Sequence, residues 1–415
     1  MENIIVDKYV LCKRLLFYLD RGDSLRNKQG DYGIRVEIAK NDNDLRYMIT
    51  EEGIPIQDAC LWLDFISMNS YLTGERYAYA LLRFFRYLKA NKLHYGEITS
   101  KNVVEEYIKD LLGLNEKVIN YESRMTFTAL NTYITVLKGF YHWLEDEKKV
   151  TVNPVMFNSK RSKQAPLVNT KLLYGQIWQF DLEESILSRV LYRKKHNHLK
   201  WYTEQEIINI LSELPTLRDK LIFSISVETG MRIGEILGLK LDHFNPLEPS
   251  LEVVRQQNIE NRAQAKTMER TLYIYQSLAD MIQAYISTER EEVDLFYSDF
   301  LFLNARGVHK GKALKSRNFL RILKDAGEKS GLLRSEIRTH SGRSTRAQHL
   351  IELMRDQPEI GITKTFIDEE LGWRSERSIK AYEKGYSMKQ KRKIMERISP
   401  VILKSVKDEN ENGEK

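Results

Sequence analysis

Cysteine is almost absent from this chain of 415 residues, which contains only Cys12 and Cys60. Neither belongs to a CxxC motif, and no Cys/His group has the spacing of a zinc site, so the sequence indicates neither a disulfide framework nor a structural metal. Apolar runs long enough to cross a bilayer are also lacking. The first residues, MENIIVDKYVLCKRLL, lack the features of a secretion signal. We therefore expect a cytoplasmic protein with no membrane partner.

A clustered set of acidic residues suited to Mg²⁺ is missing as well, and we expect no cofactor. The net charge is +7 with a pI near 9.0, which favours an anionic partner but is modest for this length. Bases gather in the stretches KRSKQ at 160–164 and YRKKHNHLK at 192–200. The candidate contacts to a polyanion are Lys160, Arg161, Lys163, Arg193, Lys194 and Lys195. A solvated linker would have the same composition.

Apolar periodicity divides the chain into parts. Residues 1–54 combine a helix-like stretch with the alternating strand pattern YGIRVEIAK, which predicts a small N-terminal unit. Residues 55–155 predict a bundle of four amphipathic helices, with apolar residues three and four apart. These are Leu61, Phe65 and Ile66; Leu81, Phe84, Phe85 and Leu88; Val104, Tyr107, Ile108 and Leu111; and Leu130, Ile134, Leu137, Tyr141 and Leu144. Residues 156–199 have no clear period and predict a basic linker.

A second domain is predicted from residue 200 to about 398. Thr203 and Glu206 form a capping-box pattern at its start, and helices are expected at 217–228 and 232–240, separated by Gly230. The segments SLEVVRQ and RTLYIYQ read as two short strands. This domain is thus expected to be mostly α with a small antiparallel sheet. The charged tail at 399–415 is predicted to be partly disordered.

Two segments contain closely spaced polar groups. In TGMRIGE, Arg232 and Glu235 lie three residues apart on one helical face, so the carboxylate can orient the guanidinium. Taken alone, this is also the pattern of a partly buried structural ion pair. In RTHSGRSTRAQHL, His340 and Arg343 are one helical turn apart and can point to one place. A His-x-x-Arg spacing by itself also arises by chance in a basic chain.

Two further segments complete the pattern. In LGWRSERSIKAYEKGY, Trp373 precedes Tyr382 by nine positions, although aromatic residues at such spacing are ordinarily core residues. In AKTMERTLYI, Lys266 lies in a predicted turn before a strand, where a lysine is ordinarily solvated surface. In order and spacing, the four segments resemble the active-site pattern of tyrosine recombinases, the phage-integrase and Cre-like family of DNA strand exchange enzymes.

The resemblance covers roughly residues 55–395 and implies a fold. It predicts a mainly α chain in which a helical core-binding (SAM-like) bundle precedes an α+β catalytic domain with a small antiparallel sheet. Residues 1–54 would be an arm-type DNA-binding unit or an extension of the bundle. The linker bases named above become candidate DNA contacts.

The resemblance also implies roles for individual residues. Tyr382 would be the nucleophile that forms a 3′-phosphotyrosyl bond, with Tyr386 as its rival one turn later. Lys266 would protonate the leaving 5′ oxygen, and His340 would assist proton transfer. The two guanidiniums of Arg232 and Arg343 would stabilise charge on the phosphoryl oxygens, supported by Glu235. Trp373 stands where many relatives have histidine; its indole donates one hydrogen bond but cannot shuttle a proton.

The implied partner is double-stranded DNA, bound by four protomers that exchange strands through a Holliday junction. An excisionase or a DNA-bending factor could assist, and the C-terminal helix would dock on a neighbour or cap its own domain. We expect integration of a bacterial mobile element. The alternatives are a catalytically silent DNA-binding regulator on the same fold and, less consistent with the helical bundle, a type IB topoisomerase. The string His196-Asn197-His198 does not have the dispersed residues of an HNH nuclease.

Overall fold

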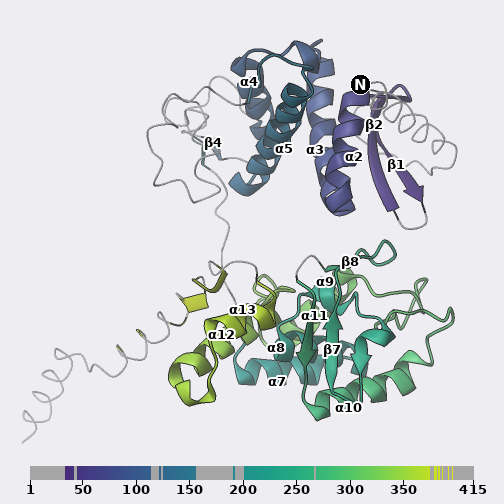
Figure 1. Ribbon diagram of the computed structural model, residues 1–415, viewed down its shortest axis with the longest axis vertical. Helices are drawn as coiled ribbons and strands as arrows, with labels where there is room; N and C mark the ends of the chain where they lie inside the picture. Colours follow the sequence, from purple (N-terminus) through teal and green to yellow (C-terminus); the bar gives the residue numbers. More distant parts are fainter. Residues whose placement is uncertain are drawn as a thin grey trace, which may run out of the picture. The chain divides into compact units, whose positions relative to one another are not determined.

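The computed structural model contains two compact units, which are divided in the sequence between His196 and Asn197 (Figure 1). The described residues are 33–41, 44–113, 121–122, 125–155, 190–191, 201–265, 268–373, 378–380, 382–383, 386, 391 and 395. In this part of the chain, no helix is both long and apolar enough to cross a membrane. The predicted N-terminal helix-like stretch and the charged tail lie outside the described residues.

The first unit contains the four helices that the sequence predicts. They are α2 (Gln57–Asn69), α3 (Tyr71–Ala90), α4 (Lys101–Leu112) and α5 (Phe127–Asp146), with a single 3₁₀ turn, η1 (Tyr95–Glu97), before α4. The predicted strand is β1 (Ile34–Asn41), which pairs antiparallel with β2 (Asp44–Glu51), and β2 pairs with the short β3 (Ile54–Pro55). This sheet packs against α2 and α3, so residues 33–55 share a unit with the bundle (Figure 1).

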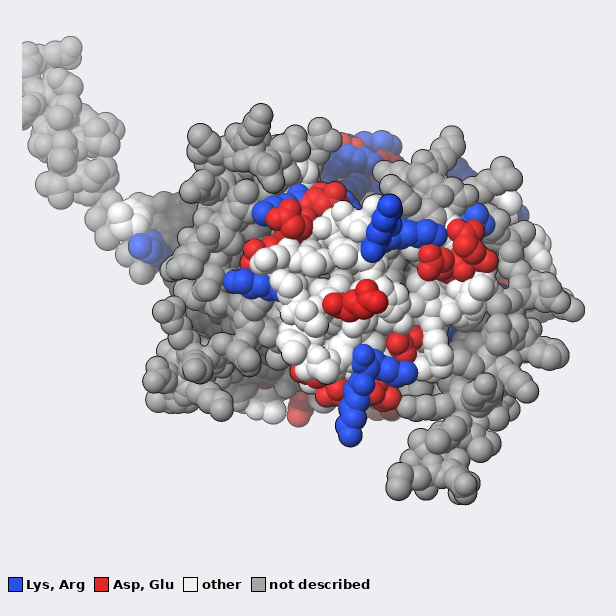
Figure 2. Space-filling model, turned by 90° about the horizontal axis from the view of Figure 1, so that it is seen from above, with Lys and Arg blue, Asp and Glu red and all other residues white. Residues whose placement is uncertain are grey.

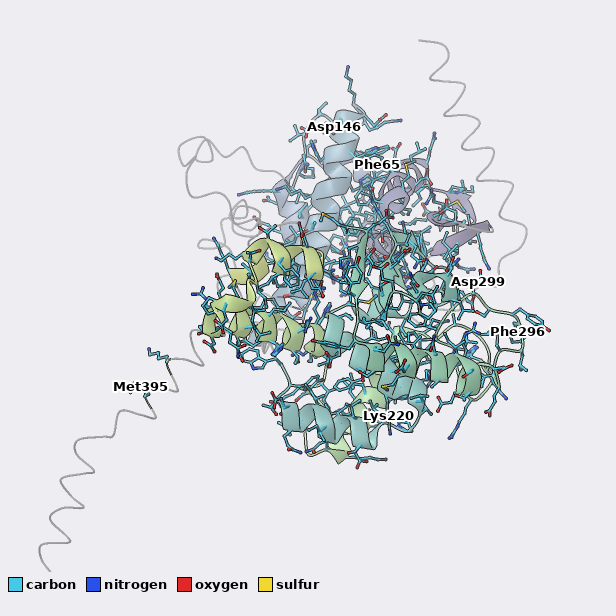
Figure 3. The ribbon with its side chains drawn as sticks, turned by 60° about the horizontal axis from the view of Figure 1, so that its bottom comes forward. Phe65, Asp146, Lys220, Phe296, Asp299 and Met395 are labelled. Atoms are coloured by element: carbon cyan, nitrogen blue, oxygen red, sulfur yellow. The ribbon has the colours of Figure 1, made fainter. Side chains whose placement is uncertain are left out.

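The buried face of α2 differs from the predicted one. The apolar period predicts that Phe65, which is labelled in Figure 3, faces the core, but 56% of this residue is exposed. The helix instead buries Trp62 and Leu63, and the Trp62 ring lies 5.4 Å from that of Phe140 on α5. Because α2 is covered by β2 as well as by α3 and α5, its apolar contacts are set by two kinds of neighbour, which helical period alone does not reveal. The predicted apolar positions of α3, α4 and α5 are buried.

Only a short part of the predicted linker is described. In this part, β5 (Val190–Leu191) pairs in parallel with β4 (Tyr121–Glu122). The six linker bases proposed as DNA contacts lie outside the described residues. On the face shown in Figure 2, the basic and acidic residues among the described part of the chain are interspersed around uncharged surface, and those visible form no single-sign patch.

The second unit is mostly helical with a small antiparallel sheet, which confirms the predicted fold class. Its helices are α7 (Glu204–Glu213), α8 (Leu217–Thr229), α9 (Ile233–Ile236), α10 (Gln276–Tyr285), the π-helix η4 (Ile286–Arg290), α11 (Ser316–Lys329), α12 (Ser341–Asp356) and α13 (Lys364–Leu371), with 3₁₀ turns η3 (Leu241–His243) and η5 (Pro358–Ile360). The three-stranded sheet has the order β10 (Arg270–Tyr273), β7 (Ser250–Val253), β6 (Phe244–Asn245). A two-stranded hairpin, β8 (Gln256–Gln257) and β9 (Gln264–Ala265), precedes β10. The predicted capping box at Thr203 is present.

The sequence predicts a helix over residues 232–240, but the observed helix α9 is much shorter. Helix α9 is a single turn, and Arg232 is its N-cap residue with an extended backbone (ψ 146°). The apolar residues that follow pair with a second extended segment, since the Leu301 N–H donates to the Leu239 carbonyl at 2.9 Å and Lys240 forms a β-bridge with Phe300. The N–H groups of residues 237–239 still donate within the local turn, but the Leu239 carbonyl and the Leu241 N–H bond to the second segment. Tertiary pairing thus replaces the next helical turn.

Candidate active site

The crossing of α8 and α12 brings the two sequence motifs together. Gly342 lies in the first turn of α12, between His340 and Arg343, and a Cβ placed on it would be only 2.1 Å from the Ser226 Oγ of α8. Only glycine permits this approach. The two helices therefore meet closely at the point where α12 begins, next to the end of α8 that leads to Arg232.

Arg232 is held by the carboxylate of Glu235. Its Nη1 donates to Glu235 Oε1 at 3.0 Å, and its backbone N–H donates to Oε2 at 3.0 Å. The Arg232 side chain remains 31% exposed, whereas that of Glu235 is fully buried. The ion pair with the buried Glu235 thus fixes the Arg232 guanidinium, and the exposed part of the guanidinium remains accessible to an anion.

Arg270, which no sequence motif identifies, shares this carboxylate. From the start of β10 its Nη2 donates to Glu235 Oε2 at 3.0 Å, and its Nε donates to the Glu370 carbonyl at 3.0 Å. Only 9% of its side chain is exposed. A single arginine at the edge of a predicted strand resembles ordinary surface, so no sequence pattern marks it. The buried Glu235 is neutralised by two guanidiniums, one exposed and one enclosed.

Arg343 is buried and anchored by backbone oxygens. Its Nη1 donates to the Gly230 carbonyl at 2.8 Å and its Nη2 to the Leu371 carbonyl. Gly230 adopts the left-handed conformation (φ 67°) that ends α8. Burial, followed by the positive charge of Arg232, lowers the pKa of Arg343 to about 9, so it stays cationic at neutral pH. Two guanidiniums close enough to repel each other form a site that an anion would stabilise.

His340 lies at the N-cap position of α12, beside both arginines. The residue retains exposed surface, but partial burial of its ring and then the charges of Arg232 and Arg343 lower its pKa below the usual value. The imidazole is therefore neutral at pH 7, with one nitrogen able to accept a proton.

Trp373 and Tyr382 lie next to Arg343. Their rings stack with centroids 5.3 Å apart and planes 24° apart, and the Arg343 guanidinium carbon lies 5.5 Å from the Trp373 ring. Tyr386, the rival tyrosine, has different surroundings: its hydroxyl donates to Asp356 Oδ1 at 2.6 Å. The structure thus groups Tyr382 with the arginine site and places the Tyr386 hydroxyl on the far end of α12.

Six of the predicted site residues therefore lie in one neighbourhood: Arg232, Glu235, His340, Arg343, Trp373 and Tyr382. Lys266 lies outside the described residues, directly after β9 in the sequence. Its role stays a prediction, as do the roles of the linker bases.

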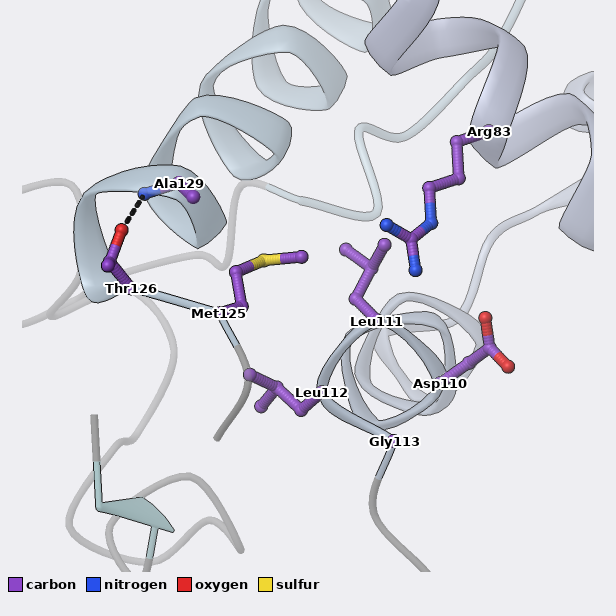
Figure 4. Close-up of a pocket in the computed structure, with 8 residues that line it drawn as sticks. All are labelled: Arg83, Asp110, Leu111, Leu112, Gly113, Met125, Thr126 and Ala129. Carbon is purple, nitrogen blue, oxygen red and sulfur yellow. Dashed lines mark hydrogen bonds between the residues drawn. The ribbon is translucent and has the colours of Figure 1, made fainter. Parts of the chain in front are cut away.

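A cavity in the first unit is separate from this group of residues. It has a volume of about 680 Å³ and lies between α3, the end of α4 and the start of α5 (Figure 4). Arg83 and Asp110 border it together with apolar residues, and Thr126 Oγ1 accepts a hydrogen bond from the Ala129 N–H at 3.2 Å. Gly113 and Met125 in its lining adjoin, in the sequence, residues 114–120 and 123–124, which lie outside the described part of the chain.

A helical unit followed by a mixed unit that gathers two guanidiniums, an imidazole, an indole and a phenol is the arrangement of a tyrosine recombinase. Residues 200–387 match the model of the phage integrase family, so this part of the chain belongs to that family of tyrosine recombinases. Transposase A from transposon Tn554 of Staphylococcus aureus is 23% identical over 332 residues, covering 76% of this chain and 86% of that protein. Tyrosine recombinase XerD of Listeria monocytogenes is 23% identical, covering 74% and 83%.

Solved structures share the fold. The XerH site-specific recombinase bound to a palindromic difH substrate has a TM-score of 0.52 at 16% identity, covering 78% of this chain and 80% of that one. The Tn1549 transposon integrase in complex with a circular intermediate DNA also has a TM-score of 0.52, at 15% identity, covering 78% and 94%.

Proposed function

We propose that this protein cuts and rejoins DNA at specific sites through a covalent bond to Tyr382. The observation that carries the proposal is the stacking of Tyr382 on Trp373, directly beside the buried guanidinium of Arg343. A nucleophile and an anion-stabilising pair then lie within one site, which is what attack on a phosphodiester requires.

The proposed step conserves the bond energy of the DNA backbone. The Tyr382 hydroxyl oxygen attacks phosphorus, a 3′-phosphotyrosyl bond forms, and the bond from phosphorus to the 5′ oxygen breaks. The leaving oxygen takes a proton, which by family resemblance comes from Lys266, and becomes a 5′ hydroxyl. Attack by a 5′ hydroxyl of the partner strand reverses the chemistry, so resealing consumes no nucleotide cofactor.

The arginines would stabilise the transition state. Arg232 and Arg343 would contact the non-bridging oxygens, where their N–H groups oppose the developing negative charge. Glu235 keeps Arg232 in place, and the carbonyls of Gly230 and Leu371 keep Arg343 in place, so no reorganisation is needed when charge appears. Neutral His340 would accept the Tyr382 proton, and the Trp373 indole would donate a hydrogen bond to the phosphate.

The partner is double-stranded DNA in this proposal. The names of the similar structures, a recombinase bound to its difH substrate and a transposon integrase bound to circular intermediate DNA, support it. Two DNA sites held by four protomers would exchange strands through a Holliday junction, with the C-terminal helix docking between protomers. The similarity to a transposase supports movement of a bacterial mobile element, with an excisionase or a DNA-bending protein as candidate accessory factors.

The test is covalent trapping on nicked DNA. The full-length protein is incubated with a duplex that carries the terminal repeats of its own element and a nick that lets the 5′ fragment diffuse away. A denaturing gel then shows any protein–DNA adduct. We expect an adduct with the wild type and with Tyr386→Phe, and none with Tyr382→Phe. Binding without an adduct on the correct site would contradict the proposal and favour a silent DNA-binding regulator.

A further inference from the structure

The residues just after Tyr382 make polar contacts that the proposed chemistry does not use. The described residues 378–380, 382, 383 and 386 are helical, and we call them the tyrosine helix. Glu383 accepts from Arg355 at 3.1 Å and from Lys364 at 2.9 Å. The Tyr386 hydroxyl donates to Asp356, and the Arg355 guanidinium carbon lies 5.6 Å from the Tyr386 ring. The tyrosine helix is thus tied to the end of α12 and the start of α13.

Helix α12 reaches the tyrosine helix indirectly at its start, through Trp373, and directly at its end. Arg343 in its first turn lies over Trp373, on which Tyr382 stacks, and Arg355 and Asp356 in its last turn hold Glu383 and Tyr386. The two ends are roughly 18–20 Å apart along the helix axis. One rigid helix therefore carries half of the anion site and also the attachment points of the nucleophile's helix.

The position of Asp356 supports a specific role. The C-terminus of a helix carries a partial negative charge, so an aspartate there is unfavourable for α12 itself. Its hydrogen bond at 2.6 Å to the Tyr386 hydroxyl compensates for this. Glu383 likewise engages two cations, and its side chain is only 20% exposed. The hydrogen bond from Lys364 leads the contributions that lower the pKa of Glu383, so it stays ionised at neutral pH.

We propose that Glu383 and Tyr386, with Arg355, Asp356 and Lys364, form a latch that positions Tyr382 for attack. These are positioning residues, because they act through the tyrosine helix and not on the DNA. The proposal rests on the proposed function and deepens it. The latch sets how often the Tyr382 hydroxyl faces the scissile phosphate, while the affinity for DNA is set elsewhere.

The test compares Tyr386→Phe, Glu383→Gln and the double variant with the wild type. Each substitution keeps the shape of the side chain: Tyr386→Phe removes the hydrogen bond to Asp356, and Glu383→Gln removes the negative charge that pairs with Arg355 and Lys364. Arg334→Gln is the matched control, because Arg334 pairs with two carboxylates, Asp325 and Glu328, on the exposed surface of the same unit. Three quantities are measured with the full-length protein: the rate of adduct formation at saturating nicked duplex, the dissociation constant for that duplex, and hydrogen exchange of peptides covering residues 378–391 without DNA.

We expect the double variant to form adduct about tenfold more slowly and to exchange these amides about tenfold faster, the scale of one or two charge-assisted hydrogen bonds. Its affinity for DNA should change less than about twofold. Arg334→Gln should leave all three quantities unaltered. The latch would be overturned if the double variant exchanged its amides at the wild-type rate. It would also be overturned if the double variant exchanged faster but formed adduct at the wild-type rate. Absence of an adduct in the wild type would instead refute the proposed function, and the exchange data would still decide whether these contacts hold the tyrosine helix.

Discussion

Tyr382 and Tyr386 lie one helical turn apart, yet each meets a different chemical environment. The family spacing from Trp373 favours Tyr382, and the contacts supply a physical reason for that preference. Tyr382 stacks on an indole next to a buried guanidinium, whereas the Tyr386 hydroxyl is occupied by Asp356. Its hydrogen bond to Asp356 holds the Tyr386 hydroxyl at the last turn of α12, whereas the Tyr382 ring lies beside the arginine in the first turn of that helix.

Trp373 combines a stacking surface with a hydrogen-bond donor, and substitutions separate the two. Trp373→Phe keeps an aromatic face under Tyr382 but removes the N–H, so we expect adduct formation to slow about tenfold, the effect of one hydrogen bond. Trp373→Ala removes both and should slow it further. Single-turnover cleavage at saturating DNA measures the rates. Equal rates for the two variants would show that stacking contributes nothing to the reaction.

The pKa of His340 should respond to DNA. In the free protein its pKa lies below the ordinary 6.5, because burial and two arginines disfavour the cation. Between the folded pKa and 6.5 the unfolded chain binds more protons, so the free energy of unfolding rises with pH in that window. A bound phosphate offsets the arginine charge and should raise the pKa. NMR titration of His340 with and without duplex, using His340→Gln for assignment, checks both; a free-protein midpoint above 6.5 would contradict the sign.

Glu235 should be indispensable for stability as well as for orientation. Glu235→Gln leaves two neighbouring guanidiniums without their carboxylate, one of them on a side chain that is 9% exposed. We expect a loss of about 3 kcal/mol in the free energy of unfolding, as for other broken buried pairs. Calorimetry measures it, with Glu328→Gln as an exposed-pair control expected to cost less than about 1 kcal/mol. If Glu235→Gln and Glu328→Gln lowered the free energy of unfolding by similar amounts, burial of the Glu235 ion pairs would contribute nothing to stability.

The sequence predicts the members of the site better than their supports. Motif order identifies Arg232, His340, Arg343 and Tyr382, because the chemistry fixes both residue type and spacing. Motif order does not identify Arg270. This residue bonds to Glu235 although the two are 35 positions apart in the sequence, and such a tertiary contact leaves no local sequence pattern. The latch has no sequence signal for the same reason.

At the level of the helices, the α8–α12 crossing admits no side chain at Gly342. A Cβ there would be 2.1 Å from Ser226 Oγ and 2.9 Å from its Cβ. Gly342→Ala should therefore separate the helices, lower the free energy of unfolding by about 1–3 kcal/mol and displace His340 and Arg343. Ser226→Gly in the same chain removes both clashing atoms and should restore part of the loss. Thermal unfolding and adduct yield of the three variants test it; independent effects of the two substitutions would contradict a direct clash.

The apolar period of the sequence predicts the buried face of three helices of the first unit, but not that of α2 or the length of α9. The apolar positions of α3, α4 and α5 are buried as expected. In α2 the buried face includes Trp62 and Leu63 instead of Phe65, and the helix packs against β2, α3 and α5. In α9 the helix stops early because residues 239–241 pair with the extended segment at 299–301. The spacing of apolar residues predicts which face of a helix is buried, but it does not predict which other segments cover that face.

For the whole molecule, DNA affinity should depend steeply on salt. Phosphate contacts release counterions, so a chain that makes six or more of them loses on the order of 10³-fold in affinity between about 50 and 200 mM salt. Replacing Lys160, Arg161 and Lys163 with glutamine should reduce the slope of log K against log salt by up to about 3. Fluorescence anisotropy with a labelled duplex measures both slopes. If the triple variant had the same slope as the wild type, Lys160, Arg161 and Lys163 would not contact DNA phosphates.

The stack of Arg343, Trp373 and Tyr382 has an optical consequence. Trp373 is one of five tryptophans in the chain, and its indole lies near both the Arg343 guanidinium and the Tyr382 phenol. Indole emission depends on the charges and rings in contact with it. Departure of Tyr382 from this stack would therefore alter the intrinsic fluorescence of Trp373. In a variant that keeps only this tryptophan, the movement of the nucleophile becomes visible in real time without an attached dye.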